Sequence, residues 1–202
     1  MRPGCRVLDA HNPPPVRADS PALEVLTDLA KIPVATIAPD DLLSDANQSM
    51  LLRGVRLLLV TDNDGYICGV IATADFLGVK PIMVAQSRGL MRHELRVSDV
   101  MTPIEQVEVL RFADVVRAQV GNVVATLKAV TRVHALVVED MDDGQVLRGI
   151  FSASQIARQL GIHLTSHDAE HIFAEIEMAI AALPSSAERP RAVQSRPESS
   201  VA

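Results

Sequence analysis

The chain has 202 residues, of which 48% are hydrophobic and only 2% aromatic, and its formal net charge is −6. A core of aliphatic residues without Trp fits an α/β protein of one or two small domains better than a sandwich rich in aromatic pairs. The acidic balance argues against nucleic-acid binding, and no run approaches the roughly 20 apolar residues of a membrane-spanning helix.

Both ends of the chain are predicted to be disordered. Residues 1–20 include the run Pro13 to Pro15, and residues 184–202 combine Pro, Ser and Arg with almost no large apolar residue. The N-terminus has no apolar signal segment, and Cys5 and Cys68 form no C-x-x-C pattern. We therefore expect a cytoplasmic protein with neither a nucleic-acid nor a membrane partner.

An internal repeat organises the ordered part. Residues 54–78 (GVRLLLVTDNDGYICGVIATADFLG) parallel residues 132–161 (RVHALVVEDMDDGQVLRGIFSASQIARQLG). Each copy has a β-rich run, an acidic turn whose Asp-Gly step favours a hairpin, a second strand and a helix. The second turn is longer, so the offset between the copies grows from 78 residues before it to 80 after it.

The segments upstream of the two hairpins also agree. With the same offset, Ser44 and Asn122 are predicted as helix N-caps at matching places. The first strand of the second repeat has two candidates, residues 115–117 (VVR) and residues 107–110 (VEVL), the latter requiring an unusually long helix after it. We favour residues 115–117, because they keep the repeats in register.

Two such units should share a core, since about 60 residues bury too little surface for comfortable stability alone. Their pairing predicts a cleft with pseudo-twofold symmetry. After the second unit, one helical stripe is predicted to pack on the protein's own body or on a second subunit, with a target-binding helix as the weaker alternative. The stripe consists of Ile172, Ile176, Ala179, Ile180 and Leu183.

These features together resemble a pair of CBS (cystathionine-β-synthase-type) domains, a Bateman module. They are the two β-α-β-β-α units, the VSDVMT segment before the second, and the Gly-hydrophobic-x-Ser/Thr-x-x-Asp ending, over residues 34–161. The resemblance implies an α/β fold of two CBS repeats packed with pseudo-twofold symmetry, plus a C-terminal helix. The implied organisation is a disordered segment (1–20), a first CBS domain (21–92), a linker with the second CBS domain (93–165), an amphipathic helix (166–183) and a disordered tail (184–202).

In that family the cleft between the paired domains binds adenine nucleotides or related adenosyl ligands. By resemblance, Gly69 and Gly149 let a ligand approach the backbone, Ser152 supplies a hydroxyl to phosphate, and Asp75 holds the ribose. His134 matches a histidine that reaches the phosphates. The implied ligand-binding set is Arg56, Gly69, Thr73, Asp75, Thr102, Arg132, His134, Gly149, Ser152 and Gln155.

Neither repeat carries the complete motif. In the first, Ala72 stands at the hydroxyl position and the hydroxyl lies on Thr73. In the second, Gln155 replaces the ribose-binding aspartate. After His134, Ala135 replaces the usual Arg, and the repeat offset places Arg56 at the equivalent position of the first unit. Modest affinity, or occupancy of only one of two sites, follows from these departures.

Structural explanations exist for the same residues. Residues 152–155 (SASQ) also form a capping-box pattern, and a carboxylate such as Asp75 suits the first turn of any helix. His163, His167 and His171 lack further converging ligands, so no metal site is expected. No nucleophile-base pair or Walker-type loop is present, so we do not expect an enzyme.

The sequence therefore favours a stand-alone regulatory module that binds an adenosine-containing ligand between its repeats and signals to an effector protein. The alternative is a ligand-free CBS pair that acts in dimerisation or protein interaction. By resemblance a homodimer is expected and no resident cofactor. Among regulatory ligands, AMP, ADP or ATP is favoured over S-adenosylmethionine or NAD.

Overall fold

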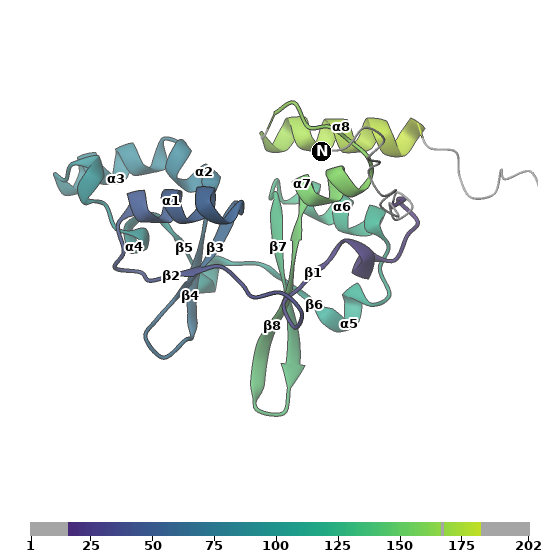
Figure 1. Ribbon diagram of the computed structural model, residues 1–202, viewed down its shortest axis with the longest axis horizontal. Helices are drawn as coiled ribbons and strands as arrows, with labels where there is room; N and C mark the ends of the chain where they lie inside the picture. Colours follow the sequence, from purple (N-terminus) through teal and green to yellow (C-terminus); the bar gives the residue numbers. More distant parts are fainter. Residues whose placement is uncertain (1–15, 167, 183–202) are drawn as a thin grey trace, which may run out of the picture.

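The computed structural model describes residues 16–166 and 168–182 and contains two four-stranded sheets, each covered by helices (Figure 1). Residues 1–15, His167 and residues 183–202 lie outside these residues. The prediction of disorder for residues 16–20 is wrong, because the Val16 N–H donates to the Gln159 carbonyl oxygen at 3.1 Å and the Val120 N–H donates to the Ser20 carbonyl oxygen at 2.9 Å. The α/β architecture, the two repeated units and the C-terminal helix are confirmed. The first unit comprises β2 (Thr36–Ile37), α1 (Leu43–Arg53), β3 (Leu57–Thr61), β4 (Ile67–Ala72), α2 (Thr73–Leu77), α3 (Lys80–Arg88), the 3₁₀ helix η2 (Arg92–Glu94), α4 (Val97–Val100) and β5 (Thr102–Pro103).

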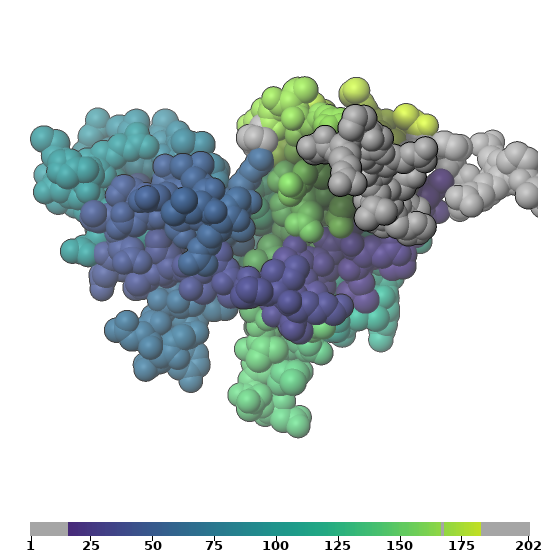
Figure 2. Space-filling view, in the orientation of Figure 1, coloured from purple at the N-terminus to yellow at the C-terminus, as the bar shows by residue number. Residues whose placement is uncertain are grey.

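The second unit repeats this plan and ends in an additional helix. A 3₁₀ helix, η1 (Ala22–Val25), and strand β1 (Thr27–Asp28) precede the first unit in the chain but pack on the second. The remaining elements are η3 (Ile104–Gln106), β6 (Val109–Arg111), α5 (Phe112–Val115), α6 (Val120–Ala129), β7 (His134–Met141), β8 (Gly144–Ser152), α7 (Ala153–Gln159) and α8 (Ala169–Ala182). Figure 2 shows two bodies divided by a groove, with the N-terminal segment crossing between them.

Each sheet takes its last edge strand from the segment that precedes the other unit. The sheet orders are β2-β3-β4-β5 and β1-β8-β7-β6, so β5 joins the first unit and β1 joins the second. In register, Thr102 faces Val70 on β4, and Thr27 faces Ile150 on β8. The predicted domain boundary at residues 92 and 93 therefore does not separate the two sheets in space.

The two motif glycines permit these edge strands to approach. A Cβ on Gly69 would lie 2.7 Å from the Thr102 carbonyl oxygen and 2.9 Å from Met101 Sδ. A Cβ on Gly149 would lie 2.7 Å from Leu26 Cδ1 and 2.9 Å from the Thr27 carbonyl oxygen. The expectation that these glycines let a ligand approach the backbone is corrected, because the approaching group is the protein's own strand.

The strand register changes the repeat alignment by one residue. Leu57 pairs with Ala72 on the neighbouring strand, and His134 pairs with Ser152 in the same place of the second unit. His134 therefore corresponds to Leu57 and not to Arg56, as the sequence offset had predicted. Similarity of two apolar runs leaves a one-residue slip open, whereas the ladder fixes which side chains share a face.

The first strand of the second unit lies earlier than predicted. Residues 109–111 pair in parallel with β7, and residues 115–117, the favoured candidate, belong to the end of helix α5 and the turn after it. The extra turn of helix between β6 and α6 absorbs the additional residues, so α6 is not unusually long. The predicted offset of 78 residues therefore fails at this strand, and it is also one residue too long for the helices, which follow Leu42 and Gln119.

The predicted helix N-caps are also corrected. Helix α1 begins after Leu42, which leaves Ser44 inside its first turn. Helix α6 begins after Gln119, whose backbone N–H donates to Asn122 Oδ1 at 2.9 Å. Asn122 thus satisfies the helix start from the third helical position instead of from the cap itself.

Helix α8 packs on its own unit through its apolar stripe. Ile172, Phe173 and Ile176 are buried in one cluster with residues of α6 and α7. On its outer side, Glu177 forms an ion pair with Lys128 of α6. The first of the predicted packing alternatives, on the protein's own body, is therefore the one the fold adopts for this stripe.

Candidate functional site

Two cavities meet at the boundary between the units, and both are lined by Leu57 and His134. These two side chains begin equivalent strands of the repeats, so they lie at the centre of the pseudo-twofold arrangement. Each cavity is lined by the strand-to-helix junction of one unit and by the first residues of a strand of the other unit. A molecule in either cavity would therefore touch both units.

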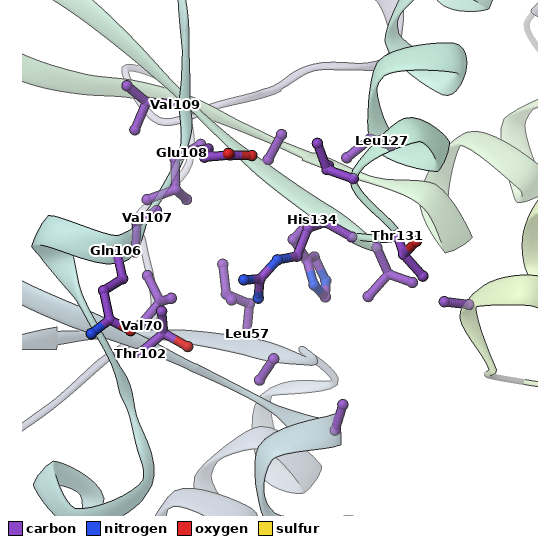
Figure 3. A pocket seen from close by; sticks show the side chains of 18 of the residues that line it. Leu57, Val70, Thr102, Gln106, Val107, Glu108, Val109, Leu127, Thr131 and His134 are labelled. Carbon is purple, nitrogen blue, oxygen red and sulfur yellow. The ribbon is translucent and has the colours of Figure 1, made fainter.

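The first cavity has a volume of about 340 Å³ and walls that are largely apolar. Leu57, Val70, Val107 and Leu127 contribute to these walls (Figure 3). Its charged lining consists of Asp75, Glu108, Asp168 and Arg132. Because carboxylates outnumber the arginine, this cavity suits a neutral or cationic group better than a phosphate.

Asp75 has a structural role at the edge of this cavity. Its Oδ2 accepts a hydrogen bond of 2.7 Å from the backbone N–H of Ala72, at the start of α2. Its Oδ1 lies 3.7 Å from Lys80 Nζ. The carboxylate thus caps its own helix, and its lone pairs facing the cavity can also accept hydroxyl groups.

The second cavity has a volume of about 400 Å³ and a cationic lining. Arg56 and Arg158 reach it from different units, and no Asp or Glu is among its described lining residues. Ser152 and Ser154 lie on the same wall, with their hydroxyl oxygens 3.2 Å apart. Hydroxyl groups and two guanidinium groups form a favourable environment for an anion.

Gln155 lines the second cavity and does not complete a capping box. Its Oε1 accepts a hydrogen bond of 3.2 Å from Thr27 Oγ1 on the exchanged strand β1. Ser152 occupies the N-cap position of α7 but makes no side-chain capping bond there. The capping explanation of residues 152–155 is therefore wrong, whereas the same explanation holds for Asp75.

Burial lowers the pKa values of two basic groups at the centre, His134 and Arg56. Burial, together with the nearby Arg56 charge, lowers the pKa of His134 to about 4, so its imidazole is neutral at pH 7. Burial and the Arg158 charge lower the pKa of Arg56. A bound anion would offset the repulsion between the Arg56 and Arg158 guanidinium groups.

The pH dependence of stability should report the His134 environment. The pKa of His134 is about 4 in the folded chain against an ordinary value of 6.5, so the unfolded chain takes up a proton that the folded chain excludes. Stability should be fully present above pH 6.5 and fall as the pH decreases toward 4. Allowing for partial exposure, the loss should be about 2 kcal/mol.

Urea unfolding at a series of pH values measures this loss. His134→Gln should remove most of it, whereas His93→Gln, at an exposed position of η2, should retain the wild-type profile. Equal profiles for wild type and His134→Gln would show that the pH dependence has another origin.

The structure brings together seven of the ten predicted site residues. Arg132, Asp75 and Thr102 line the first cavity, His134 lines both, and Arg56, Ser152 and Gln155 line the second. Gly69 and Gly149 instead accommodate edge strands. Thr73 lines neither cavity, because its hydroxyl turns toward Met50 Sδ and the Arg56 carbonyl oxygen.

Several lining residues were not predicted. Thr27 precedes the recognised repeat and reaches the second cavity only because β1 crosses to the other sheet. Arg158 and His163 follow the motif helix, and Asp168 stands at the start of α8. Thr27 takes the same sheet position as Thr102, an equivalence that only the strand register shows.

Comparison with known families agrees with this arrangement. Residues 26–81 match the model of the CBS domain family. The second unit repeats the topology of the first. The chain has the fold of a tandem CBS pair. No curated protein matches it.

Solved structures resemble the chain at low sequence identity. An uncharacterized conserved protein from Pyrococcus horikoshii is 19% identical, with a TM-score of 0.53, and the match covers 75% of this chain and 99% of that protein. CBSX2 in complex with AMP is 20% identical, with a TM-score of 0.49, and the match covers 69% of this chain and 94% of CBSX2. The CBS domain pair of MJ0100, with 5′-methylthioadenosine and S-adenosyl-L-methionine, is 18% identical, with a TM-score of 0.49, over 70% and 96%.

The part of the chain that the structure describes holds neither a membrane-spanning helix nor a cluster of metal-ligating side chains. Within residues 16–166 and 168–182, no helix is both long and apolar enough to cross a membrane. In the same residues, no three His, Cys, Asp or Glu side chains gather as a metal site. His171 Nε2 instead lies 2.9 Å from Thr165 Oγ1 and 3.0 Å from Glu175 Oε1. These contacts connect the first turns of α8 to the segment before it.

Proposed function

We propose that this CBS pair is a regulatory module that binds an adenosine-containing ligand between its units and signals occupancy to an effector protein. The observation that carries the proposal is that both cavities are built from both units and meet at Leu57 and His134. A ligand that contacts both units can favour one relative packing of them over another. An effector could read that change.

The second cavity is the proposed site for an adenine nucleotide. Arg56 and Arg158 supply charge for the phosphate, and Ser152 supplies a hydroxyl at the start of α7. Charge-assisted hydrogen bonds of this kind are about twice as strong as neutral ones. Gln155 and Thr27 are joined by a hydrogen bond. Hydroxyl groups of a bound ribose could replace this bond with hydrogen bonds of their own to the two side chains.

The first cavity would accept an adenosyl group without a phosphate. Asp75 can hold the ribose hydroxyls, and the apolar wall around Val70 and Val107 suits a purine. Glu108 and Asp168 would repel a phosphate but favour a sulfonium or an amine. S-adenosylmethionine and 5′-methylthioadenosine are therefore the ligands to test there, and AMP, ADP and ATP at the second cavity.

Calorimetric titration of the full chain tests the assignment. Arg158→Gln should weaken AMP binding about tenfold to a hundredfold, the value of a lost charged hydrogen bond, and leave folding stability unchanged because Arg158 is exposed. Arg117→Gln, an exposed charge change outside both cavities, should bind AMP as wild type does.

The same titration separates the two cavities. Asp75→Asn should weaken binding of an uncharged adenosyl ligand while leaving AMP affinity within about twofold, since a twofold change is a small free energy. If neither ligand class binds folded, nucleotide-free protein, the sensor proposal is wrong, and a ligand-free pair acting in dimerisation or protein interaction becomes the better account.

A further inference from the structure

The helix that precedes each hairpin ends in the same kind of turn. After α1, the Gly54 N–H donates to the Leu51 carbonyl oxygen at 3.4 Å, and after α6 the Thr131 N–H donates to the Lys128 carbonyl oxygen at 2.9 Å. In each unit the following residue donates to the carbonyl oxygen one position earlier in the helix, at 3.1 Å in the first unit and 3.0 Å in the second. Gly54 and Thr131 are therefore equivalent residues of the two repeats.

This turn places one residue in the left-handed backbone conformation. The angle φ is 64° at Gly54 and 51° at Thr131. Glycine adopts this conformation readily, whereas a β-branched side chain is strained there. Among residues 16–166 and 168–182, Thr131 is the only residue other than glycine with a positive φ. The second unit thus has a strained threonine at a position where the first unit has glycine.

The Thr131 side chain contributes little to the fold of the described residues. It is exposed, and its hydroxyl forms no hydrogen bond with residues 16–166 or 168–182. By contrast, Thr126 on the same helix donates its hydroxyl to the Asn122 carbonyl oxygen at 2.9 Å. The strain at Thr131 is therefore offset neither by burial nor by a hydrogen bond in the part of the chain that the structure describes. Strained residues of this kind cluster at ligand sites.

The two equivalent residues line different cavities. Thr131 lines the first cavity, as Figure 3 shows, and Gly54 lines the second. The same turn therefore adds a methyl group and a hydroxyl group to one cavity and only backbone to the other. In the first cavity the ionised carboxylates of Asp75, Glu108 and Asp168 can only accept hydrogen bonds. A threonine hydroxyl can also donate one, for example to a ring nitrogen of an adenosyl group.

We propose that Thr131 is a specificity-determining residue of the first cavity and donates a hydrogen bond from its hydroxyl to an adenosyl ligand. This inference rests on the proposed function of that cavity. The left-handed threonine is then maintained for a contact that only the ligand-bound chain makes. Gly54 offers no equivalent side chain to the second cavity, so this position distinguishes the ligand preferences of two otherwise symmetry-related sites.

Thermal unfolding of the ligand-free full chain tests the strain at this position. Thr131→Gly should raise the melting temperature by about 2 to 4 °C, because glycine relieves the left-handed conformation. Gly54→Ala should lower it, since a Cβ there would meet nothing within 4 Å beyond its own chain neighbours and only the backbone conformation opposes it. Thr131→Val retains the branched side chain and should melt near the wild-type temperature. A lower melting temperature for Thr131→Gly would overturn the proposal, because the threonine would then stabilise the fold.

Calorimetric titration with 5′-methylthioadenosine tests the contact itself. Thr131→Val should raise the dissociation constant about threefold to tenfold, the value of one hydrogen bond between neutral groups. Thr131→Gly should weaken binding at least as much, although it is the more stable protein. AMP affinity should stay within about twofold of wild type in both variants, because Thr131 does not line the second cavity. Thr36→Val, the same change at an exposed position of β2 outside both cavities, should bind both ligands as wild type does.

The outcomes separate the role of Thr131 from the proposed function. If wild type binds 5′-methylthioadenosine and Thr131→Val binds it equally well, Thr131 makes no ligand contact, and the proposed function of the cavity stands. If wild type binds AMP but not 5′-methylthioadenosine, the first cavity is not an adenosyl site, so the role of Thr131 is overturned and only the second cavity is a nucleotide site. If wild type binds neither ligand, both proposals are wrong.

Discussion

Gly69→Ala is expected to lower the free energy of unfolding by about 2 to 3 kcal/mol, the upper part of the range for overpacked sites. The added Cβ would stand 2.7 Å from the Thr102 carbonyl oxygen, and a backbone group in a paired strand cannot move aside cheaply. Relief requires that β5 shift away from β4. Because Thr102 lines the first cavity, that shift would also distort the proposed ligand site.

Urea denaturation of Gly69→Ala and Gly121→Ala measures this effect. Gly121 lies in α6. The atom nearest to a Cβ added at this position is the Ala18 carbonyl oxygen, at 3.3 Å. Ala is favoured over Gly inside a helix, so this control should change stability by less than about 1 kcal/mol. Equal losses in the two variants would mean that the close approach of β5 does not require the glycine.

Ile176→Ala is expected to cost about 3 to 4 kcal/mol, as for other large-to-small changes at fully buried sites. Ile176 is 0% exposed and belongs to the cluster that joins α8 to α6 and α7. This loss would identify α8 as part of the second unit's core and not as a detachable target-binding helix.

Met178→Ala supplies the comparison on the same helix. Its side chain is 71% exposed, so the change in unfolding free energy should stay within about 0.5 kcal/mol. The difference between the two variants, measured by chemical denaturation, isolates the packing of the buried face. If Ile176→Ala unfolds no more readily than Met178→Ala, α8 contributes little to the fold.

Local patterns were enough to predict the repeated architecture. The acidic Asp-Gly turns produce the hairpins between β3 and β4 and between β7 and β8, because glycine tolerates the positive φ found at Gly65 and Gly144. The helical spacing of Ile172 and Ile176 likewise predicted a buried stripe. These features depend on neighbours a few residues apart, which is the range that sequence periodicity reports.

The site depended on contacts between distant segments. Asp75, His134 and Ser152 were predicted from motifs that recur in each repeat, and they do line the cavities. Thr27 and Asp168 were missed because they come from outside the repeats. Strand β1 reaches the second unit only by crossing to its sheet, and no local pattern records which sheet an edge strand will join.

The sequence by itself thus determined two α/β units, their hairpins, the C-terminal amphipathic helix and seven of the polar residues that line the two cavities. Only the tertiary structure decided that Leu57, and not Arg56, is the counterpart of His134 in the first unit. The reason is that strand register is set by pairing between segments that lie apart in the sequence. It also decided that α8 covers one helical face and leaves Leu51 and Leu77 exposed on the other. An amphipathic pattern shows that a face must be covered, but which surface covers it depends on how the whole chain packs.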